Sequence, residues 1–276
     1  MDTSGLYRQN KSLGRSHLDR SRTARVALPS LVAAGKTLPL RNNATSLRTN
    51  PAIRKLNMPS TLQAIGAHVI GTHGDLLHPT DLLVRRGELV VVAGEPGHGH
   101  TALSLALAGQ IHLFRGSVLI DGVPDAGRLR QKVALVDTPG VTEPEKSLSV
   151  AVIVGEELSM AHRPASRAAV RAWLAEQGAA EYAGLRWDRT PVVLRTTLLV
   201  AAAAARPQTA FIVLTCPDRW GGTARQWHDL ASRWVDLGYG VVLQCSEPLA
   251  EAMAVPFSRL GAAEDPNRVA PQTERV

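Results

Sequence analysis

The chain contains short apolar runs that alternate with longer stretches in which apolar residues recur at helical spacing. The runs are rich in β-branched residues, and each is followed by a turn or a helix. Buried strands of a parallel sheet have this pattern, because both faces of such a sheet are covered. We therefore predict strands at residues 89–93, 118–120, 133–136, 211–214 and 241–243.

Helical stretches lie between these runs, and this order is typical of an α/β protein with a mostly parallel sheet flanked by helices. In the last stretch, Trp227, Leu230 and Trp234 share one helical face, so both tryptophans are predicted to belong to the core. The predicted helical regions are 101–108, a block at 149–182, 195–205 and 223–237.

Both ends of the chain differ from the region between them. Residues 1–57 mix Ser, Arg, Asn and Thr without periodicity, so this basic N-terminal extension is predicted to be disordered. Its composition also fits a transit peptide, an arm for anionic surfaces, or a chain that truly starts at Met58. Residues 58–260 form the predicted domain, and residues 261–276 a flexible C-terminal tail.

The positive charge is concentrated in the N-terminal extension. The formal net charge is +7, but residues 1–60 hold 11 Lys and Arg against two acidic residues, and the remainder holds 20 against 22. We therefore expect no nucleic-acid binding by the core, and contact of the basic tail with anionic surfaces. The longest apolar stretch, 198–205, is too short to cross a bilayer, and two cysteines make no disulfide framework, so a cytoplasmic location is expected.

The most specific motif lies in segment 87–109, where a predicted strand leads into a glycine-rich loop and then a helix. Gly94, Gly99, His100 and Thr101 match the Walker A pattern G-x-x-x-x-G-K-[ST] except at its lysine. Unpaired amides and the helix dipole favour an anion at such a helix start, and Thr101 is suited to hold Mg²⁺. The predicted cofactor-binding residues are Gly94, Glu95, Pro96, Gly97, His98, Gly99, His100, Thr101 and Ala102.

His100 replaces the lysine of this pattern. A lysine ammonium is a permanent cation that reaches the β- and γ-phosphates, whereas an imidazole is shorter and mostly neutral near pH 7. Losing one electrostatic donor of this kind typically slows catalysis by about 10²- to 10³-fold. We therefore expect nucleotide binding through main-chain amides, with weak hydrolysis.

Several segments in order make residues 61–248 resemble the nucleotide-binding domain of ABC transporters. A Gly-Glu pair at 87–88 opens the Walker A strand, and RGSVLIDGVP at 115–124 is similar to the family's G-x-v-x-x-d-G hairpin. TAFIVLTCPDRWGG and GYGVVLQCSEP resemble the Walker B strand and the strand that ends in the switch histidine. The resemblance implies a P-loop NTPase fold with a small antiparallel β part and a helical subdomain at about 142–194.

The resemblance also implies that the catalytic set is largely replaced. The family's glutamine falls near Asp137, the Walker B aspartate at Thr215, the catalytic glutamate at Cys216 and the switch histidine near Ser246. General-base and charge-stabilising groups each contribute about 10²- to 10⁴-fold, so their combined loss predicts a binder rather than an efficient hydrolase.

Other family features are equally altered. The best register for the signature loop is 189–193, and this segment lacks the Gly-Gly pair. His68 and His73 are the only candidates for an aromatic residue that stacks on adenine, and a solvent-exposed histidine is the simpler explanation of each. Asp218 is a candidate base or metal ligand, although an Asp after Pro more often shapes a turn. The resemblance places Cys216 and Cys245 at neighbouring strand ends, as a thiol pair, a soft metal site or, by default, buried inert thiols.

The function implied by the resemblance is an ATP-binding subunit of a transport system, using ATP and Mg²⁺. Its implied partners are a membrane permease and a second nucleotide-binding domain, at the cytoplasmic face of the membrane. Two alternatives stay open. One is a P-loop GTPase, in which DTPG at 137–140 binds magnesium and the γ-phosphate, and TCPD at 215–218 and Ser246 contact guanine. The other is an interaction module that binds no nucleotide.

Overall fold

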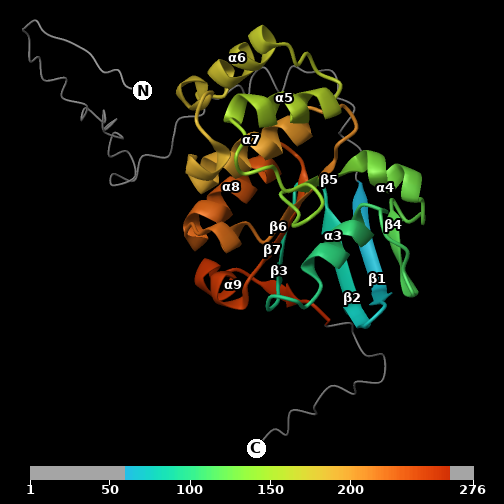
Figure 1. Ribbon diagram of the computed structural model, residues 1–276. Helices are drawn as coiled ribbons and strands as arrows, with labels where there is room; N and C mark the ends of the chain where they lie inside the picture. The colour runs from blue at the N-terminus through green and yellow to red at the C-terminus, as the bar shows by residue number, and fades with distance from the viewer. Residues whose placement is uncertain (1–59, 262–276) are drawn as a thin grey trace, which may run out of the picture. The chain divides into compact units, whose positions relative to one another are not determined.

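Two β-sheets organise the part of the chain that the computed structural model describes, residues 60–261 (Figure 1). A parallel sheet has the strand order β5-β6-β7-β3-β8, and an antiparallel sheet has the order β2-β1-β4. The parallel strands are β3 (Leu89–Ala93), β5 (Val133–Val136), β6 (Phe211–Thr215), β7 (Gly240–Cys245) and β8 (Phe257–Arg259). The antiparallel strands are β1 (Thr61–Gly71), β2 (Gly74–Arg85) and β4 (Arg115–Ile120).

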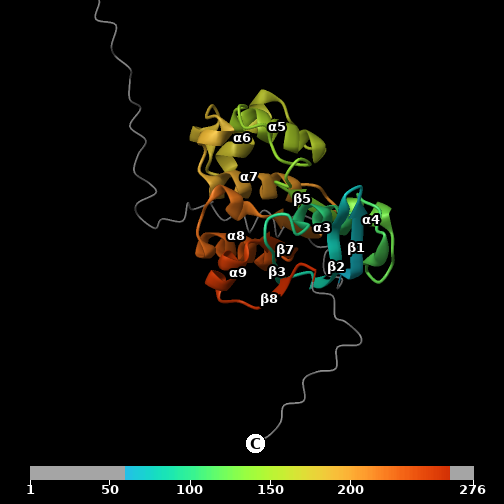
Figure 2. The same cartoon turned by 60° about the horizontal axis from the view of Figure 1, so that its bottom comes forward.

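Helices cover both faces of the parallel sheet (Figures 1 and 2). Helix α3 (His100–Leu107) lies between the two sheets, in contact with β1, β2, β5 and β6. On the opposite face, α7 (Val192–Ala204) contacts β5, and α8 (Ala224–Asp236) contacts β3 and β7. The remaining helices are α4 (Ala126–Lys132), α5 (Val150–Met160), α6 (Arg167–Glu176), α9 (Glu247–Met253) and the short 3₁₀ helices η2 (Ala180–Tyr182), η3 (Trp187–Arg189) and η4 (Pro217–Trp220).

Alternate residues of the central strand β6 serve two different cores. Phe211 and Val213 pack with α3 and the antiparallel sheet, whereas Ile212 and Leu214 pack with α5, α7 and α8. All four side chains are at most 1% exposed. A strand covered on both faces has no room for polar alternation, which explains its continuous apolar sequence.

The fold class predicted from the sequence is confirmed, and most predicted strands are present. β3 and β5 have the predicted bounds, while β4, β6 and β7 are longer than predicted. Trp227 and Trp234 are buried in the core, as predicted. The individual elements β1, β2, α4, α9 and β8 were not predicted, because β1 and β2 pair through several register shifts and the others are short.

The segment between β5 and α7 contains the helices α5, α6, η2 and η3, in agreement with the helical part of the predicted fold class. The predicted bounds of this subdomain, about 142–194, stay a prediction. Helices α5 and α6 stack beyond α7, away from the parallel sheet (Figures 1 and 2). The expectations for residues 1–57 and for the C-terminal tail beyond Gly261 lie outside the described residues. Among residues 60–261, no helix has the length and apolarity needed to cross a membrane.

Candidate functional site: the phosphate loop and the strand ends

The glycine-rich loop connects the end of β3 to the start of α3. At its start, the Gly94 amide donates to the Cys245 carbonyl at 3.1 Å. Gly97 has φ 92°, and a Cβ on this residue would meet no atom within 4 Å, so the loop is open there. Gly99 has φ 104° and packs tightly against the main chain of Leu76 and Leu77 in β2. Glycine is therefore required twice, for conformation at both positions and for close approach at the second.

Main-chain donors remain available at the start of α3. Within residues 60–261, five amides have no hydrogen-bond acceptor, those of Gly97, Gly99, His100, Thr101 and Ala102. The His98 amide, by contrast, donates to the Glu95 carbonyl at 3.1 Å within the loop, and its predicted role in binding stays a prediction. Helices α4, α5, α6 and α8 each have a side-chain cap, whereas α3, α7 and α9 have none. An uncapped helix start with free amides is suited to an anion.

The His100 side chain turns toward the sheet. It is 8% exposed, with Nε2 at 2.9 Å from the Gly94 carbonyl oxygen and Nδ1 at 3.2 Å from Gln244 Oε1 in β7. Nε2 must carry a proton to donate to the carbonyl, because a carbonyl oxygen only accepts. The imidazole therefore braces the loop against β7, and in this conformation His100 offers a ligand its amide rather than its ring.

Buried hydroxyls fill the space below the loop. Thr215 Oγ1 lies 2.8 Å from Ser104 Oγ and 2.9 Å from Thr138 Oγ1, and Gln244 Nε2 donates to Ser104 Oγ at 2.7 Å. Ser104, Thr138, Thr215 and Gln244 are each at most 1% exposed. The resemblance aligns Thr215 with the Walker B aspartate, so it implies a carboxylate where the structure has a neutral hydroxyl paired inside the protein.

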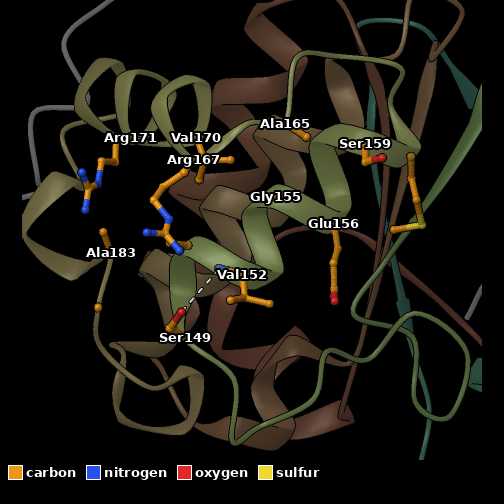
Figure 3. A pocket seen from close by; sticks show the side chains of 13 residues that line it. Ser149, Val152, Gly155, Glu156, Ser159, Ala165, Arg167, Val170, Arg171 and Ala183 are labelled. Atoms are coloured by element: carbon orange, nitrogen blue, oxygen red, sulfur yellow. Dashed lines mark hydrogen bonds between the residues drawn. The ribbon is translucent and has the colours of Figure 1, made fainter.

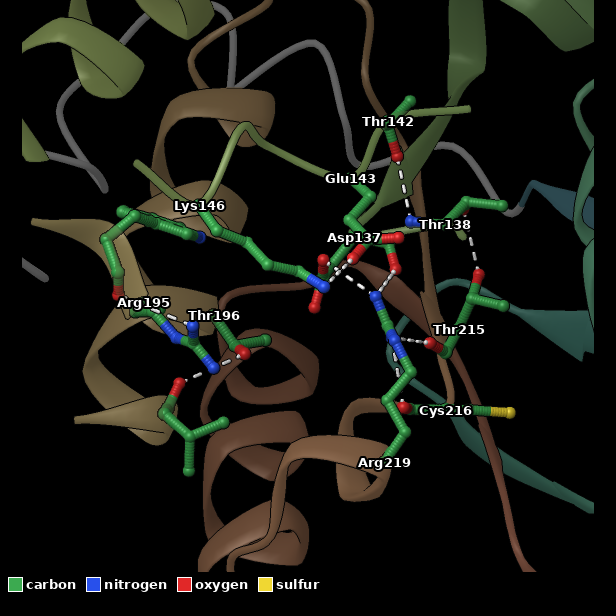
Figure 4. Close-up of polar contacts among 12 residues, drawn as sticks. Asp137, Thr138, Thr142, Glu143, Lys146, Arg195, Thr196, Thr215, Cys216 and Arg219 are labelled. Atoms are coloured by element: carbon green, nitrogen blue, oxygen red, sulfur yellow. Dashed lines mark hydrogen bonds and ion pairs between the residues drawn. The ribbon is translucent and has the colours of Figure 1, made fainter. Parts of the chain in front are cut away.

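Arg219, from η4, joins the ends of β5 and β6 (Figure 4). Its Nη2 donates to the Asp137 carbonyl at 2.7 Å and lies 2.8 Å from Asp137 Oδ1. Its Nη1 donates to the carbonyls of Thr215 at 2.7 Å and Cys216 at 3.0 Å. One guanidinium thus binds four oxygen atoms. The two side chains are 21% and 9% exposed for Arg219 and Asp137, so this ion pair is largely shielded from solvent.

Further charges surround this ion pair. Burial raises the pKa of Asp137, and the nearby guanidinium of Arg219 opposes this rise. The Trp220 ring lies under Lys146 at 4.4 Å, Arg219 at 5.0 Å and Arg195 at 5.5 Å. Cations over an indole face are attracted by its quadrupole, so Trp220 holds three positive groups near Asp137.

Asp218 and Ser246 are brought together by the fold. Asp218 Oδ2 accepts hydrogen bonds from the Ser246 amide at 3.1 Å and the Ser246 hydroxyl at 2.7 Å. Asp218 Oδ1 is buried and has no partner among the described residues. The carboxylate therefore links the segment after β6 to the start of α9, a contact between distant segments rather than the local turn role that the sequence favoured.

Both cysteines lie at neighbouring strand ends, as the resemblance implied, because β7 lies between β6 and β3. Burial raises the pKa of each thiol, Cys216 and Cys245, to about 12. Both are free thiols. Thiolates are the reactive and metal-binding form, so these residues fit the inert alternative.

The histidines proposed for adenine stacking lie in or next to β1. His68 is not the exposed residue that we expected, because its Nε2 lies 2.9 Å from Asp75 Oδ1 and its ring packs edge-on against Phe114. His73 is exposed in the turn between β1 and β2. The segment 189–193 leads into α7, and Thr190 within it is buried, with Oγ1 donating to the Arg186 carbonyl at 3.0 Å.

Sequence reasoning missed Arg219 and the buried residues Ser104 and Gln244. A signal for Arg219 was present, because a cation four residues after Thr215 is placed to reach back to the strand ends. Ser104 and Gln244 gave no such signal, because a single polar residue within an apolar run looks the same whether or not it has a partner.

A separate groove lies on α5 and α6 and shares no residue with the phosphate loop (Figure 3). It has a volume of about 1000 Å³, and small residues such as Ala151, Gly155 and Gly184 line much of it. Val152 and Met160, also part of its lining, are 45% and 62% exposed. The lining also includes the charged residues Glu156, Arg167 and Arg171, so the groove is mixed in character.

Comparison with known sequences gives one short match. The chain is 36% identical over 64 residues to the hemin import ATP-binding protein HmuV of Myxococcus xanthus (strain DK1622). The match covers 23% of this chain and 24% of that protein, so it spans about a quarter of the relative's length. No family profile matches the chain.

Comparison with solved structures covers most of the described residues. A nucleotide-free ATP-binding cassette from an ABC transporter aligns with 74% of this chain and 90% of its own, at a TM-score of 0.53 and 15% identity. An ATP-binding subunit of an ABC transporter aligns with 72% of this chain and 85% of its own, at a TM-score of 0.51 and 17% identity. CbiO1 of Clostridium perfringens, part of the ABC transporter complex cbiONQ, aligns with 67% of this chain and 78% of its own, at a TM-score of 0.50 and 16% identity. Residues 60–261 therefore have the fold of the ATP-binding subunits of ABC transporters.

Proposed function

We propose that this chain is an ATP-binding subunit of an ABC-type transport system that binds nucleotide at the loop 94–101 and hydrolyses it weakly or not at all. The observation that carries the binding part is the uncapped start of α3, where five main-chain amides have no acceptor among the described residues. Such donors and the helix dipole together favour a phosphate group.

The residues at the ends of β6 and β7 are the reason for proposing weak hydrolysis. Thr215 and Cys216 provide a hydroxyl and a thiol where the family resemblance expects two carboxylates, and the Thr215 hydroxyl is already paired with Ser104 and Thr138. Burial raises the pKa of the Cys216 thiol to about 12, so it is a poor general base near neutral pH. Ser246 is bound to Asp218 and lacks the imidazole of a switch histidine.

The proposed partners are a membrane permease and a second nucleotide-binding domain, with the protein located at the cytoplasmic face of the membrane. Fold similarity to transporter subunits supports this assignment. Because the segment before α7 has no recognisable signature loop, pairing with a catalytically competent cassette fits this chain better than a symmetric ATP-closed dimer.

The test combines binding with turnover. We expect millimolar ATP to raise the melting temperature, because a ligand that binds only the folded state stabilises it. We expect no hydrolysis above background from the wild type, and no recovery in His100→Lys, because the carboxylates at 215 and 216 are still missing. Brisk hydrolysis by the wild type would contradict the proposal.

The alternatives are separated by the same assay. A clear preference for GTP over ATP would favour the GTPase interpretation, in which Asp218 and Ser246 contact guanine. Absence of any nucleotide effect would favour the interaction module.

A further inference from the structure

Magnesium is the cation that the family resemblance implies at the strand ends, and the donors present there do not suit it. Mg²⁺ requires near-octahedral oxygen ligands, usually one or two carboxylates together with phosphates and waters. Asp137 is the nearest carboxylate at the end of β5, and it is paired with Arg219 at 2.8 Å. Among residues 60–261, no cluster of three or more His, Cys, Asp or Glu side chains could hold a metal ion.

Arg219 binds the same kinds of atoms that a magnesium ion would bind. It contacts one carboxylate oxygen and the main-chain carbonyls of Asp137, Thr215 and Cys216, at 2.7 to 3.0 Å (Figure 4). The guanidinium is a permanent cation, rigid and planar, and weakly hydrated, so it is well suited to a shielded site with several acceptors. It therefore neutralises the strand ends without an external ion.

The neighbouring hydroxyls complete this arrangement. Thr215 Oγ1, which replaces the metal-anchoring carboxylate, is bound on both sides by Ser104 and Thr138. The sequence also predicted Thr101 as a magnesium ligand, and its hydroxyl makes no hydrogen bond to the described residues. One neutral oxygen atom is nevertheless a weak binding site for a hard divalent cation.

We propose that Arg219 takes the place of the divalent cation at the ends of β5 and β6, so that the loop 94–101 binds nucleotide without requiring Mg²⁺. The first half of this inference, that Arg219 replaces the cation, concerns the strand ends alone. The second half, that nucleotide binds without Mg²⁺, rests on the proposed function. Arg219 is a positioning residue here, because it contacts the protein rather than the nucleotide.

The first experiment compares ATP with EDTA against ATP with excess Mg²⁺, using the full chain and thermal denaturation or equilibrium binding. We expect the dissociation constants of ATP to agree within about twofold in the two conditions. If Mg²⁺-bound ATP makes no contact that free ATP lacks, Mg²⁺ adds no affinity. Binding that appears only with Mg²⁺ would overturn the proposal. Binding in neither condition would instead remove the proposed nucleotide function and the second half of this inference.

The second experiment tests the strand ends without nucleotide. Mg²⁺ alone should leave the melting temperature of the wild type unchanged. In Arg219→Ala, the freed Asp137 carboxylate and carbonyls should accept Mg²⁺, so Mg²⁺ alone should raise the melting temperature of this variant. A purely structural role would lower stability without creating this response, and failure of Mg²⁺ to protect folded Arg219→Ala would overturn the first half of the inference.

A double variant keeps the test decisive if Arg219→Ala does not fold. Arg219→Ala combined with Asp137→Asn removes both charges and avoids an unpaired buried carboxylate. It should fold and show no protection by Mg²⁺ alone, because the carboxylate ligand is gone. Protection of this double variant, or of the wild type, by Mg²⁺ alone would contradict the proposal.

Discussion

The start of α3 and the ends of β5 and β6 lie at the carboxyl-terminal ends of strands in the same parallel sheet, but their polar groups have different hydrogen-bond partners. At α3, five main-chain amides, at residues 97 and 99–102, have no acceptor among the described residues. At the ends of β5 and β6, Arg219 binds the carbonyls of three residues, and the hydroxyls beneath are paired with one another. The first region is open to a ligand, and the second is closed by the protein itself.

In the proposed function, nucleotide binding and hydrolysis depend on these two different regions. Phosphate binding in a P-loop depends mainly on main-chain geometry, which two glycines with positive φ preserve here. Hydrolysis depends on side chains at the strand ends, and those positions hold neutral or internally paired groups. The comparison makes predictions about both regions.

The largest expected effect on stability comes from a substitution in the glycine-rich loop before α3. Gly99→Ala should lower the free energy of unfolding by about 3 kcal/mol or more, because its Cβ would overlap the Leu76 carbonyl oxygen and φ is 104°. Chemical denaturation measures this change. Gly97→Ala is the matched control, with φ 92° and no atom within 4 Å of its Cβ.

For Gly97→Ala, we expect a smaller loss of about 1–2 kcal/mol from the conformation alone. Any protection by ATP should weaken in this variant, because the loop amides would be displaced. Equal destabilisation by both substitutions would show that the close approach to β2 is unimportant.

The next effect is a pH dependence that arises in α5, away from both regions. Burial raises the pKa of Glu157 from 4.5 to about 7, with Arg206 partly opposing the rise. A raised pKa in the folded state means that stability is fullest below pH 4.5 and falls as the pH rises toward 7. Glu157→Gln should therefore increase the free energy of unfolding at pH 8 by about 2 kcal/mol and leave it nearly unchanged at pH 4.

Denaturation curves at pH 4, 6 and 8 check this prediction. Glu156→Gln is the matched control on the same helix, because the Glu156 side chain is exposed. If Glu157→Gln did not flatten the pH profile, the pH dependence would have to arise elsewhere, with the strand-end residue Asp137 as the next candidate.

The smallest effect tests the closed region. Thr215→Val keeps the shape of the side chain and removes the hydroxyl that joins Ser104 to Thr138. We expect a loss of about 1–2 kcal/mol in the free energy of unfolding, because two buried hydroxyls each lose a partner. Unchanged stability in Thr215→Val would indicate that this hydroxyl chain does not hold the strand ends together. Thr196→Val in α7 is a control, since its hydroxyl bonds locally to the Val192 carbonyl.

The sequence by itself determined the α/β class, the strands β3 and β5, the loop 94–101 and the buried tryptophans, because each depends on local periodicity or on glycine spacing. Motif order along the chain also gave the family resemblance, and the positions of replaced catalytic residues that it implies stay a prediction.

Only the tertiary structure shows which contacts the side chains near the loop and the strand ends make. His100 turns toward Gln244, Asp218 binds Ser246, and Arg219 reaches three carbonyls, and each of these contacts joins segments from different strands. Such contacts depend on which strands are neighbours and on how their ends align, and local sequence patterns carry no information about either.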